Sequence, residues 1–148
     1  MSRVSNPPEG VPRILPHVIY ADVGAAVRWL TEVFGFRERT WVRHVSADGV
    51  IGRTQMDVLD SVITLGTPGV HGGSPRDGVS DMLYVYVDDV DAHHAGAVAA
   101  GATVVMELSD KPWGDRSYQV CDLEGHQWTF AQHVRDVDLE AEHLHTEE

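Results

Sequence analysis

The sequence predicts an α+β fold made of two tandem βαβββ modules. A strand, a capped helix and three further strands follow one another in this order twice along the chain. Asp89 follows Asp22 by 67 residues and Gly101 follows Gly35 by 66, so the helix boundaries of the two copies are in register to within one residue. A single repeat at this spacing indicates a duplicated module, because a solenoid would repeat more often.

The duplication also sets the expected boundaries. Module one should span residues 13–66, a linker rich in Gly and Pro residues 67–80, and module two residues 81–133, all within one domain. Residues 1–12 contain three prolines and are expected to form a flexible arm. The acidic residues 134–148 are expected to form a solvated tail.

Each element of module one has its own signal. Residues 13–21 are expected to form a strand, in which Pro16 favours an edge position or a bulge. Asp22 should cap a helix whose apolar residues recur at helical spacing, and Gly35 should end it in the left-handed conformation. Alternation and turn residues then predict three strands, at residues 36–44, 50–57 and 61–65.

Module two repeats this order. A strand at residues 82–87 leads to a helix that Asp89 or Asp91 caps and that Gly101 ends. The elements that follow are a strand at 102–108, a loop at 109–115, and a hairpin whose strands run over 117–120 and from His126 onward around a turn at 122–125.

The composition argues against several classes of function. A net charge of -12 argues against nucleic-acid binding, which needs a basic face. The single cysteine, Cys121, excludes an internal disulfide and a thiolate metal cluster, and it suits a cytoplasmic location. No apolar run is long enough to span a bilayer, and the first residues lack the apolar core of a signal peptide, so no membrane partner is expected.

Three motifs occur in a fixed order along the two modules. They are residues 17–22 (His-Val-Ile-Tyr-Ala-Asp) with the helix end at 29–36, residues 83–91, and the hairpin turn at 122–128. Together they resemble the vicinal oxygen chelate superfamily of glyoxalases, bleomycin-resistance proteins and ring-cleaving dioxygenases, over about residues 13–133. The Trp-Gly-Asp-Arg sequence at 113–116 is similar to that of small bacterial glyoxalase-like proteins.

The resemblance has implications for the fold and for the metal site. In this superfamily each module curls its sheet into half of an incomplete barrel around a cavity, and two chains often form a homodimer, which we expect here. Metal-dependent members carry ligands at the positions of Leu15, Thr64, Met82 and Thr129. Because these side chains offer neither imidazole nitrogen nor carboxylate oxygen, we predict no metal site and no cofactor.

His17 is the residue that could restore a metal site. It lies two positions after Leu15 on the same face of the strand, and a bulge at Pro16 would move it into the ligand position. The one acidic residue that we consider as its partner is Glu107. The alternative role for His17 is a polar group that lines the cavity.

Candidate ligand-binding residues are those expected at the cavity or its rim. Trp41 and Trp113 offer aromatic surface, and the methionines 56, 82 and 106 could add apolar wall. Asp115 and Arg116 are either a site for an anionic or carbonyl-bearing ligand or an ion pair that orients the loop. The full set of candidates is His17, Trp41, Met82, Tyr84, Trp113, Asp115, Arg116, Gln127 and Thr129, and no catalytic residue is assigned.

Three classes of function remain. The favoured one is binding of an apolar or aromatic small molecule in a metal-free cavity, with a resistance or sequestration role like that of the drug-binding members of the superfamily. The alternative is a metal-dependent lyase, isomerase or dioxygenase, in which a cation acts as a Lewis acid. A structural or regulatory interaction domain would need no cavity.

Overall fold

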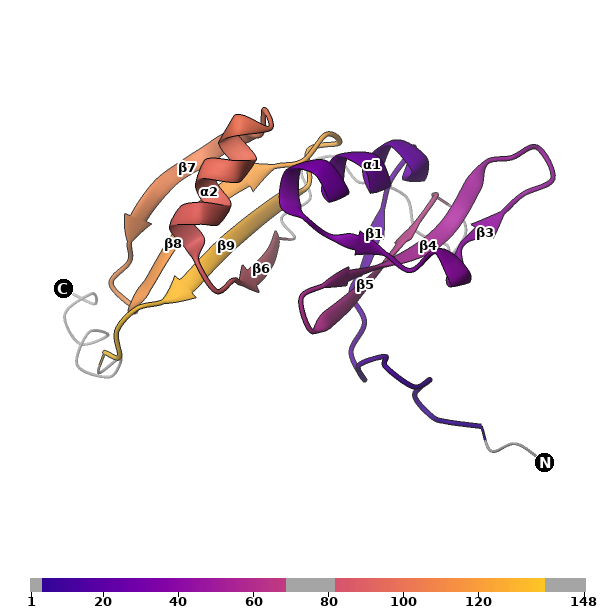
Figure 1. Ribbon diagram of the computed structural model, residues 1–148, viewed down its shortest axis with the longest axis horizontal. Helices are drawn as coiled ribbons and strands as arrows, with labels where there is room; N and C mark the ends of the chain where they lie inside the picture. Colours follow the sequence, from indigo (N-terminus) through magenta and orange to yellow (C-terminus); the bar gives the residue numbers. More distant parts are fainter. Residues whose placement is uncertain (1–3, 69–81, 138–148) are drawn as a thin grey trace. The chain divides into compact units, whose positions relative to one another are not determined.

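The computed structural model describes residues 4–68 and 82–137, and the chain divides into two compact units, Met1–Val79 and Ser80–Glu148 (Figure 1). Within the described ranges, each unit has one mixed sheet and one α-helix that lies across a face of that sheet. The predicted α+β class and the two βαβββ modules are therefore confirmed. Each sheet is open and does not close on itself, and enclosure of a cavity by the two sheets stays a prediction.

Unit one begins with a short strand that leads directly into its helix. Its elements are β1 (His17–Ile19), α1 (Val23–Phe34), β2 (Arg37–Glu38), a 3-10 helix η1 (Thr40–Val42), β3 (His44–Val45), β4 (Ile51–Val58) and β5 (Ser61–Gly66). The sheet order is β1-β5-β4-β2, with β3 also paired to β4. The first strand runs parallel to β5, while the other pairs are antiparallel.

Both ends of α1 follow the predicted signals. The Asp22 carboxylate accepts a hydrogen bond from the backbone N–H of Ala25 at 2.9 Å, and Gly35 adopts a φ of 79° at the C-cap. The apolar stripe of the helix, which includes Leu30 and Phe34, is buried against the sheet, where Met56 is also fully buried. Met56 therefore belongs to the core of unit one.

Unit two repeats this arrangement with longer strands. Its elements are β6 (Met82–Tyr86), α2 (Val90–Ala99), β7 (Thr103–Asp110), β8 (Asp115–Cys121) and β9 (Gln127–His133). The sheet order is β6-β9-β8-β7, again with the first strand parallel to the last. Asp89 caps α2 by accepting from the N–H of Ala92 at 3.0 Å.

The α2 side of this sheet holds the core of unit two. Trp128 and Phe130 are fully buried, as strand parity predicts, and the Trp128 indole N–H donates to Asp122 at 3.1 Å. The His93 ring lies with its centroid 4.1 Å from that of Phe130, and its Nδ1 hydrogen bonds to the Tyr118 hydroxyl at 2.6 Å. Because these alternate residues face the helix, their neighbours face the other way.

The structure corrects several element boundaries. The strand expected at 13–21 is limited to His17–Ile19, and that expected at 36–44 is interrupted by η1. Pro16 explains the first case, because it lacks an N–H and only its carbonyl joins the sheet, accepting from Thr64 N at 2.9 Å. In the second, Val42 N and Arg43 N bond back to Arg39 and Thr40, which turns the chain out of the sheet.

The predicted arm, linker and tail lie partly outside the described residues. Residues 1–3, 69–81 and 138–148 lie outside the described ranges. In the described part of the arm, the Gly10 carbonyl accepts a hydrogen bond from the Arg39 guanidinium at 3.0 Å. No helix in the described ranges is long and apolar enough to cross a membrane.

Candidate functional site

A shallow groove lies on the face of the unit-two sheet that α2 leaves open. Its volume is about 140 Å³, and its lining residues come from four strands and the loop between β7 and β8: Met82, Tyr84, Met106, Lys111, Trp113, Ser117, Tyr118, Gln119 and Thr129. The strand register explains the gathering, since Tyr84 is paired with Thr129, Thr129 with Gln119, and Gln119 with Met106. The wall is mostly aromatic and thioether surface, which suits a flat apolar ligand.

One end of this open face carries a buried carboxylate. Asp115 is only 2% exposed, and it accepts hydrogen bonds from Tyr84 Oη at 2.6 Å, Tyr86 Oη at 2.9 Å and His133 Nδ1 at 2.8 Å. Burial alone would raise the pKa of Asp115, but the bonds from Tyr84, His133 and Tyr86 together outweigh it and lower that pKa. Asp115 is therefore a fixed anion beside the groove, to which it is linked through Tyr84.

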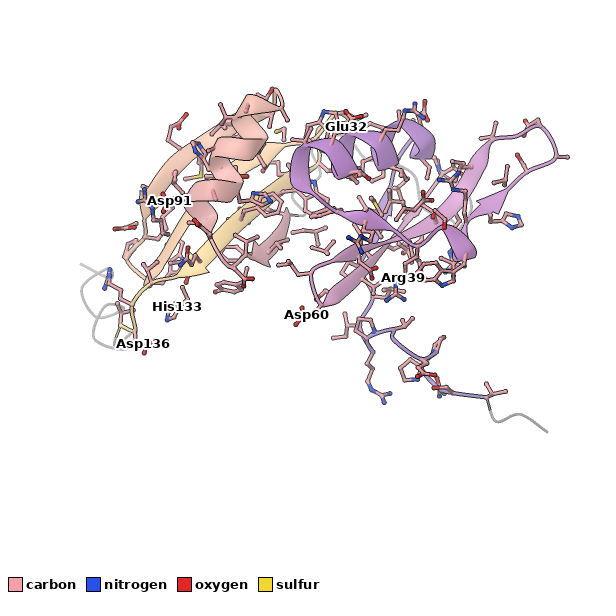
Figure 2. The ribbon with its side chains drawn as sticks, viewed as in Figure 1. Glu32, Arg39, Asp60, Asp91, His133 and Asp136 are labelled. Carbon is pink, nitrogen blue, oxygen red and sulfur yellow. The ribbon has the colours of Figure 1, made fainter. Side chains whose placement is uncertain are left out.

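His133 extends this cluster towards solvent (Figure 2). Its Nδ1 faces Asp115, and its Nε2 lies 2.7 Å from Asp136 Oδ1. Because both ring nitrogens face carboxylate oxygens, each of them acts as a donor in the protonated ring. The bond to Asp115, followed by that to Asp136, raises the pKa of His133.

Tyr84 joins the groove to this cluster. Its hydroxyl donates to Asp115 and accepts from the Trp113 indole N–H at 3.3 Å. Desolvation, together with the bond to Asp115, raises the pKa of Tyr84 to about 12. The phenol therefore keeps its proton at neutral pH and directs it at Asp115, so it serves as a fixed wall and not as a base.

Hydrogen bonds hold both ends of the loop that carries Trp113. The Gly114 carbonyl accepts from the backbone N–H groups of Val134 and Arg135, at 2.9 and 3.2 Å. Gly114 has a φ of 97°, and a Cβ placed on it would lie 2.1 Å from the Arg135 carbonyl oxygen. Lys111 Nζ donates to Ser109 Oγ at 2.6 Å and to the Ser117 carbonyl at 3.2 Å, which ties the loop to β7 and β8. These contacts position the Trp113 ring at the rim.

The structure brings most of the predicted site residues of unit two together. Met82, Tyr84, Trp113 and Thr129 line the groove, and the Thr129 hydroxyl donates to Met82 Sδ at 2.8 Å. Gln127 adjoins the groove through a hydrogen bond from the Gln119 amide at 2.5 Å.

Arg116 has a different place, because it points away from Asp115. Its guanidinium bonds to Asp91 at the start of α2 and to Asp110 at the end of β7, at 3.1 and 3.2 Å (Figure 2 labels Asp91). The interpretation of Asp115 and Arg116 as an ion pair is therefore wrong. Successive residues of β8 point to opposite faces, so the two charges bind different partners.

The two candidates of unit one lie on its own sheet and its 3-10 helix. His17 is exposed on β1, and its Nδ1 forms a hydrogen bond with the Thr64 hydroxyl. Trp41 is in η1 instead of a strand and is 75% exposed, with the Arg39 guanidinium 5.9 Å from its ring centroid. A ligand-binding role for these two residues stays a prediction.

Several residues of the open face of unit two are absent from the candidates of the sequence analysis, Ser117 among them. The others are Lys111, Gln119, Tyr86 and His133, the last of which enters the sequence analysis only as the end of module two. Parity could have found three of them, because Tyr86 follows Tyr84 by two positions, His133 follows Thr129 by four, and Gln119 is paired with Thr129. Lys111 lies in a loop, where no such period applies.

The residues described do not fit a bound metal ion. Within 4–68 and 82–137, no three His, Cys, Asp or Glu side chains converge in a way that could hold one. His17 is bonded to a hydroxyl, and Glu107 projects into solvent with its carboxylate 4.0 Å from His94 Nε2. No chemical step is therefore assigned to a metal.

The class of the protein is defined by its two βαβββ units, each with a helix on one face of a mixed sheet, and by the apolar groove on one open face. Residues 12–130 match the Glyoxalase/Bleomycin resistance protein/Dioxygenase superfamily. The chain belongs to this superfamily, as the resemblance predicted.

The chain is also similar to relatives of known sequence or structure. An uncharacterized protein of Mycobacterium bovis is 31% identical, in an alignment that covers 87% of this chain and 88% of that protein. TioX from Micromonospora sp. ML1 is 37% identical with a TM-score of 0.70, over 83% of this chain and 99% of TioX. A superfamily enzyme from Burkholderia phytofirmans PsJN, 21% identical with a TM-score of 0.65 over 80% of this chain and 95% of that one, shares the fold.

Proposed function

We propose that this protein binds an apolar or aromatic small molecule on the open face of unit two and holds it without chemical change. The groove walled by Met82, Met106, Trp113 and Tyr84 is the observation that carries the proposal. Cavities of about 150 Å³ accept a benzene ring, so a groove of about 140 Å³ matches one ring of a planar ligand. The rest of the ligand would project from the groove.

The polar groups at the groove support binding over catalysis. The single proton of Tyr84 is directed at Asp115, and the bonds of Lys111 Nζ run to Ser109 and Ser117. A general acid or base needs a proton or a lone pair aimed at the substrate and a pKa near the working pH. The raised pKa of Tyr84, about 12, does not meet this need. A resistance or sequestration role, in which the protein removes a compound from solution, requires binding alone.

Two variants of one strand test this proposal. Met106 and Val105 are neighbours on β7, 51% and 47% exposed, and Met106 lines the groove whereas Val105 does not. Because both positions are about half-exposed, a carboxylate at either one stays in contact with water, so the Met106→Glu and Val105→Glu proteins should both fold. Titration of one- and two-ring aromatics into each protein should show binding to wild type and to Val105→Glu, and at least tenfold weaker binding to Met106→Glu. Equal affinity for both variants, or no binding to wild type, would contradict the proposal.

The homodimer that the resemblance implies is part of the same proposal. The β3–β4 region of unit one leaves Trp41, Val42, Val45 and Val50 exposed, and exposed apolar side chains in one region often mark an interface. Sedimentation velocity at micromolar concentration should show a dimer. A monomer at that concentration would contradict this part of the proposal.

A further inference from the structure

Two glutamine side chains form an amide pair beside the groove. Gln119 lines the groove from β8, and Gln127 begins β9 as the register partner of Met82. Their side chains lie on the same face, and Gln119 Nε2 donates to Gln127 Oε1 at 2.5 Å. Among residues 4–68 and 82–137, the other amide groups of the pair, Gln119 Oε1 and Gln127 Nε2, have no hydrogen-bond partner.

The pair presents one donor and one acceptor whichever way its amides are turned. Each glutamine carries one carbonyl oxygen and one NH₂ group. If one amide donates to the other, the carbonyl of the donor and the NH₂ of the acceptor remain. Reversing both amides exchanges these roles between Gln119 and Gln127, but it leaves the same two kinds of group. The chemical character of this edge therefore does not depend on the assignment of the amide oxygens and nitrogens.

We infer that the ligand of the groove is a planar ring with an adjacent N–H and C=O, as in a lactam. This inference rests on the proposed function, because it concerns the same groove. A lactam N–H donates to the remaining carbonyl, and its C=O accepts from the remaining NH₂, while the ring contacts Met82 and Met106. An aromatic ring without an adjacent N–H and C=O would leave both remaining amide groups hydrogen bonded to water.

Three probes of similar shape separate the contribution of the aromatic ring from that of its N–H and C=O groups. They are 2-quinolone, N-methyl-2-quinolone, which lacks the N–H, and naphthalene, which lacks both polar groups. Wild type should bind 2-quinolone about tenfold more tightly than N-methyl-2-quinolone, because one added hydrogen bond at a partly exposed site typically has an effect of this size. Isothermal titration calorimetry measures all three affinities.

The double variant Gln119→Leu with Gln127→Leu should abolish the preference for 2-quinolone while it keeps the affinity for naphthalene. Val105→Glu is again the control, because Val105 lies on the same sheet but, among the described contacts, neither lines the groove nor bonds to the pair. It should keep the wild-type preference. Equal binding of the two quinolones to wild type, or a preference that survives in the double variant, would overturn the inference alone. Failure of all three probes to bind would overturn the proposed function, and the inference with it.

Discussion

Replacing Asp115 by asparagine should lower the free energy of unfolding of unit two by about 2 kcal/mol. The carboxylate accepts from Tyr84, Tyr86 and His133 at 2.6 to 2.9 Å, and an amide offers one acceptor in place of two. A hydrogen bond to a charged group contributes about 1 kcal/mol more than a neutral one, so three contacts give about 3 kcal/mol. Tyr86 and His133 are about half-exposed, and screening by water reduces this value.

Urea denaturation followed by circular dichroism at pH 7 measures this loss, and Asp110→Asn is the matched control. Within the described part of the chain, the Asp110 carboxylate is hydrogen bonded only to Arg116, at 3.2 Å on the surface, so its replacement should have an effect below about 1 kcal/mol. The pKa of Asp115 is lowered from 3.8 in the folded state, so its stabilisation is complete above pH 3.8 and is lost as pH falls through the lowered value. The reasoning is refuted if Asp115→Asn is as stable as Asp110→Asn at pH 7.

Three further predictions concern the loop, the histidine and the helix cap of unit two. Gly114→Ala should destabilise by about 3 kcal/mol in thermal or urea unfolding, because its Cβ would lie 2.1 Å from the Arg135 carbonyl oxygen. Gly125→Ala also places a side chain at a positive φ, of 88°, but its Cβ would have no described atom within 4 Å, so it should cost only about 1 kcal/mol. Equal losses would contradict the packing argument. Because the pKa of His133 is raised in the folded state, its protonation contributes stability that is complete below pH 6.5 and is lost as the pH rises through the folded value. In urea denaturation between about pH 5 and pH 9, His133→Gln should therefore remove this fall in the free energy of unfolding at higher pH. An unchanged pH profile would refute the prediction. Asp89→Ala should lose about 1 kcal/mol through its cap, against almost no loss for Asp88→Ala, as thermal unfolding would show.

The sequence predicted the order and type of the elements because these depend on local signals. Asp22 and Asp89 cap the two helices, glycines 35 and 101 follow them in the left-handed conformation, and the turn at 122–125 closes the last hairpin. Strand parity placed Trp128 and Phe130 under α2, and it placed Thr129 on the other face. Each of these follows from a backbone period or a cap that a few neighbouring residues specify.

The partners of individual side chains could not be read in the same way. The pairing of Asp115 with Tyr84, Tyr86 and His133 depends on the order of β6, β9 and β8 in the sheet, which brings together residues 29 to 31 positions apart, or 18 in the case of the histidine. The break at Thr40–Val42 depends on backbone bonds that no alternation pattern reports. The sequence thus indicated the face on which the site lies, but not the hydrogen-bond network that holds its walls.

The most direct measurement of the central claim uses the methionine methyl groups. Met82 and Met106 line the groove, whereas Met56 is fully buried in the core of unit one and serves as an internal reference. Methyl NMR of protein labelled with ¹³C at methionine, during titration with a planar aromatic compound, should shift the signals of Met82 and Met106 together and leave that of Met56 unchanged. A saturable ligand that moves neither Met82 nor Met106 would contradict the proposal that this face of unit two is the binding site.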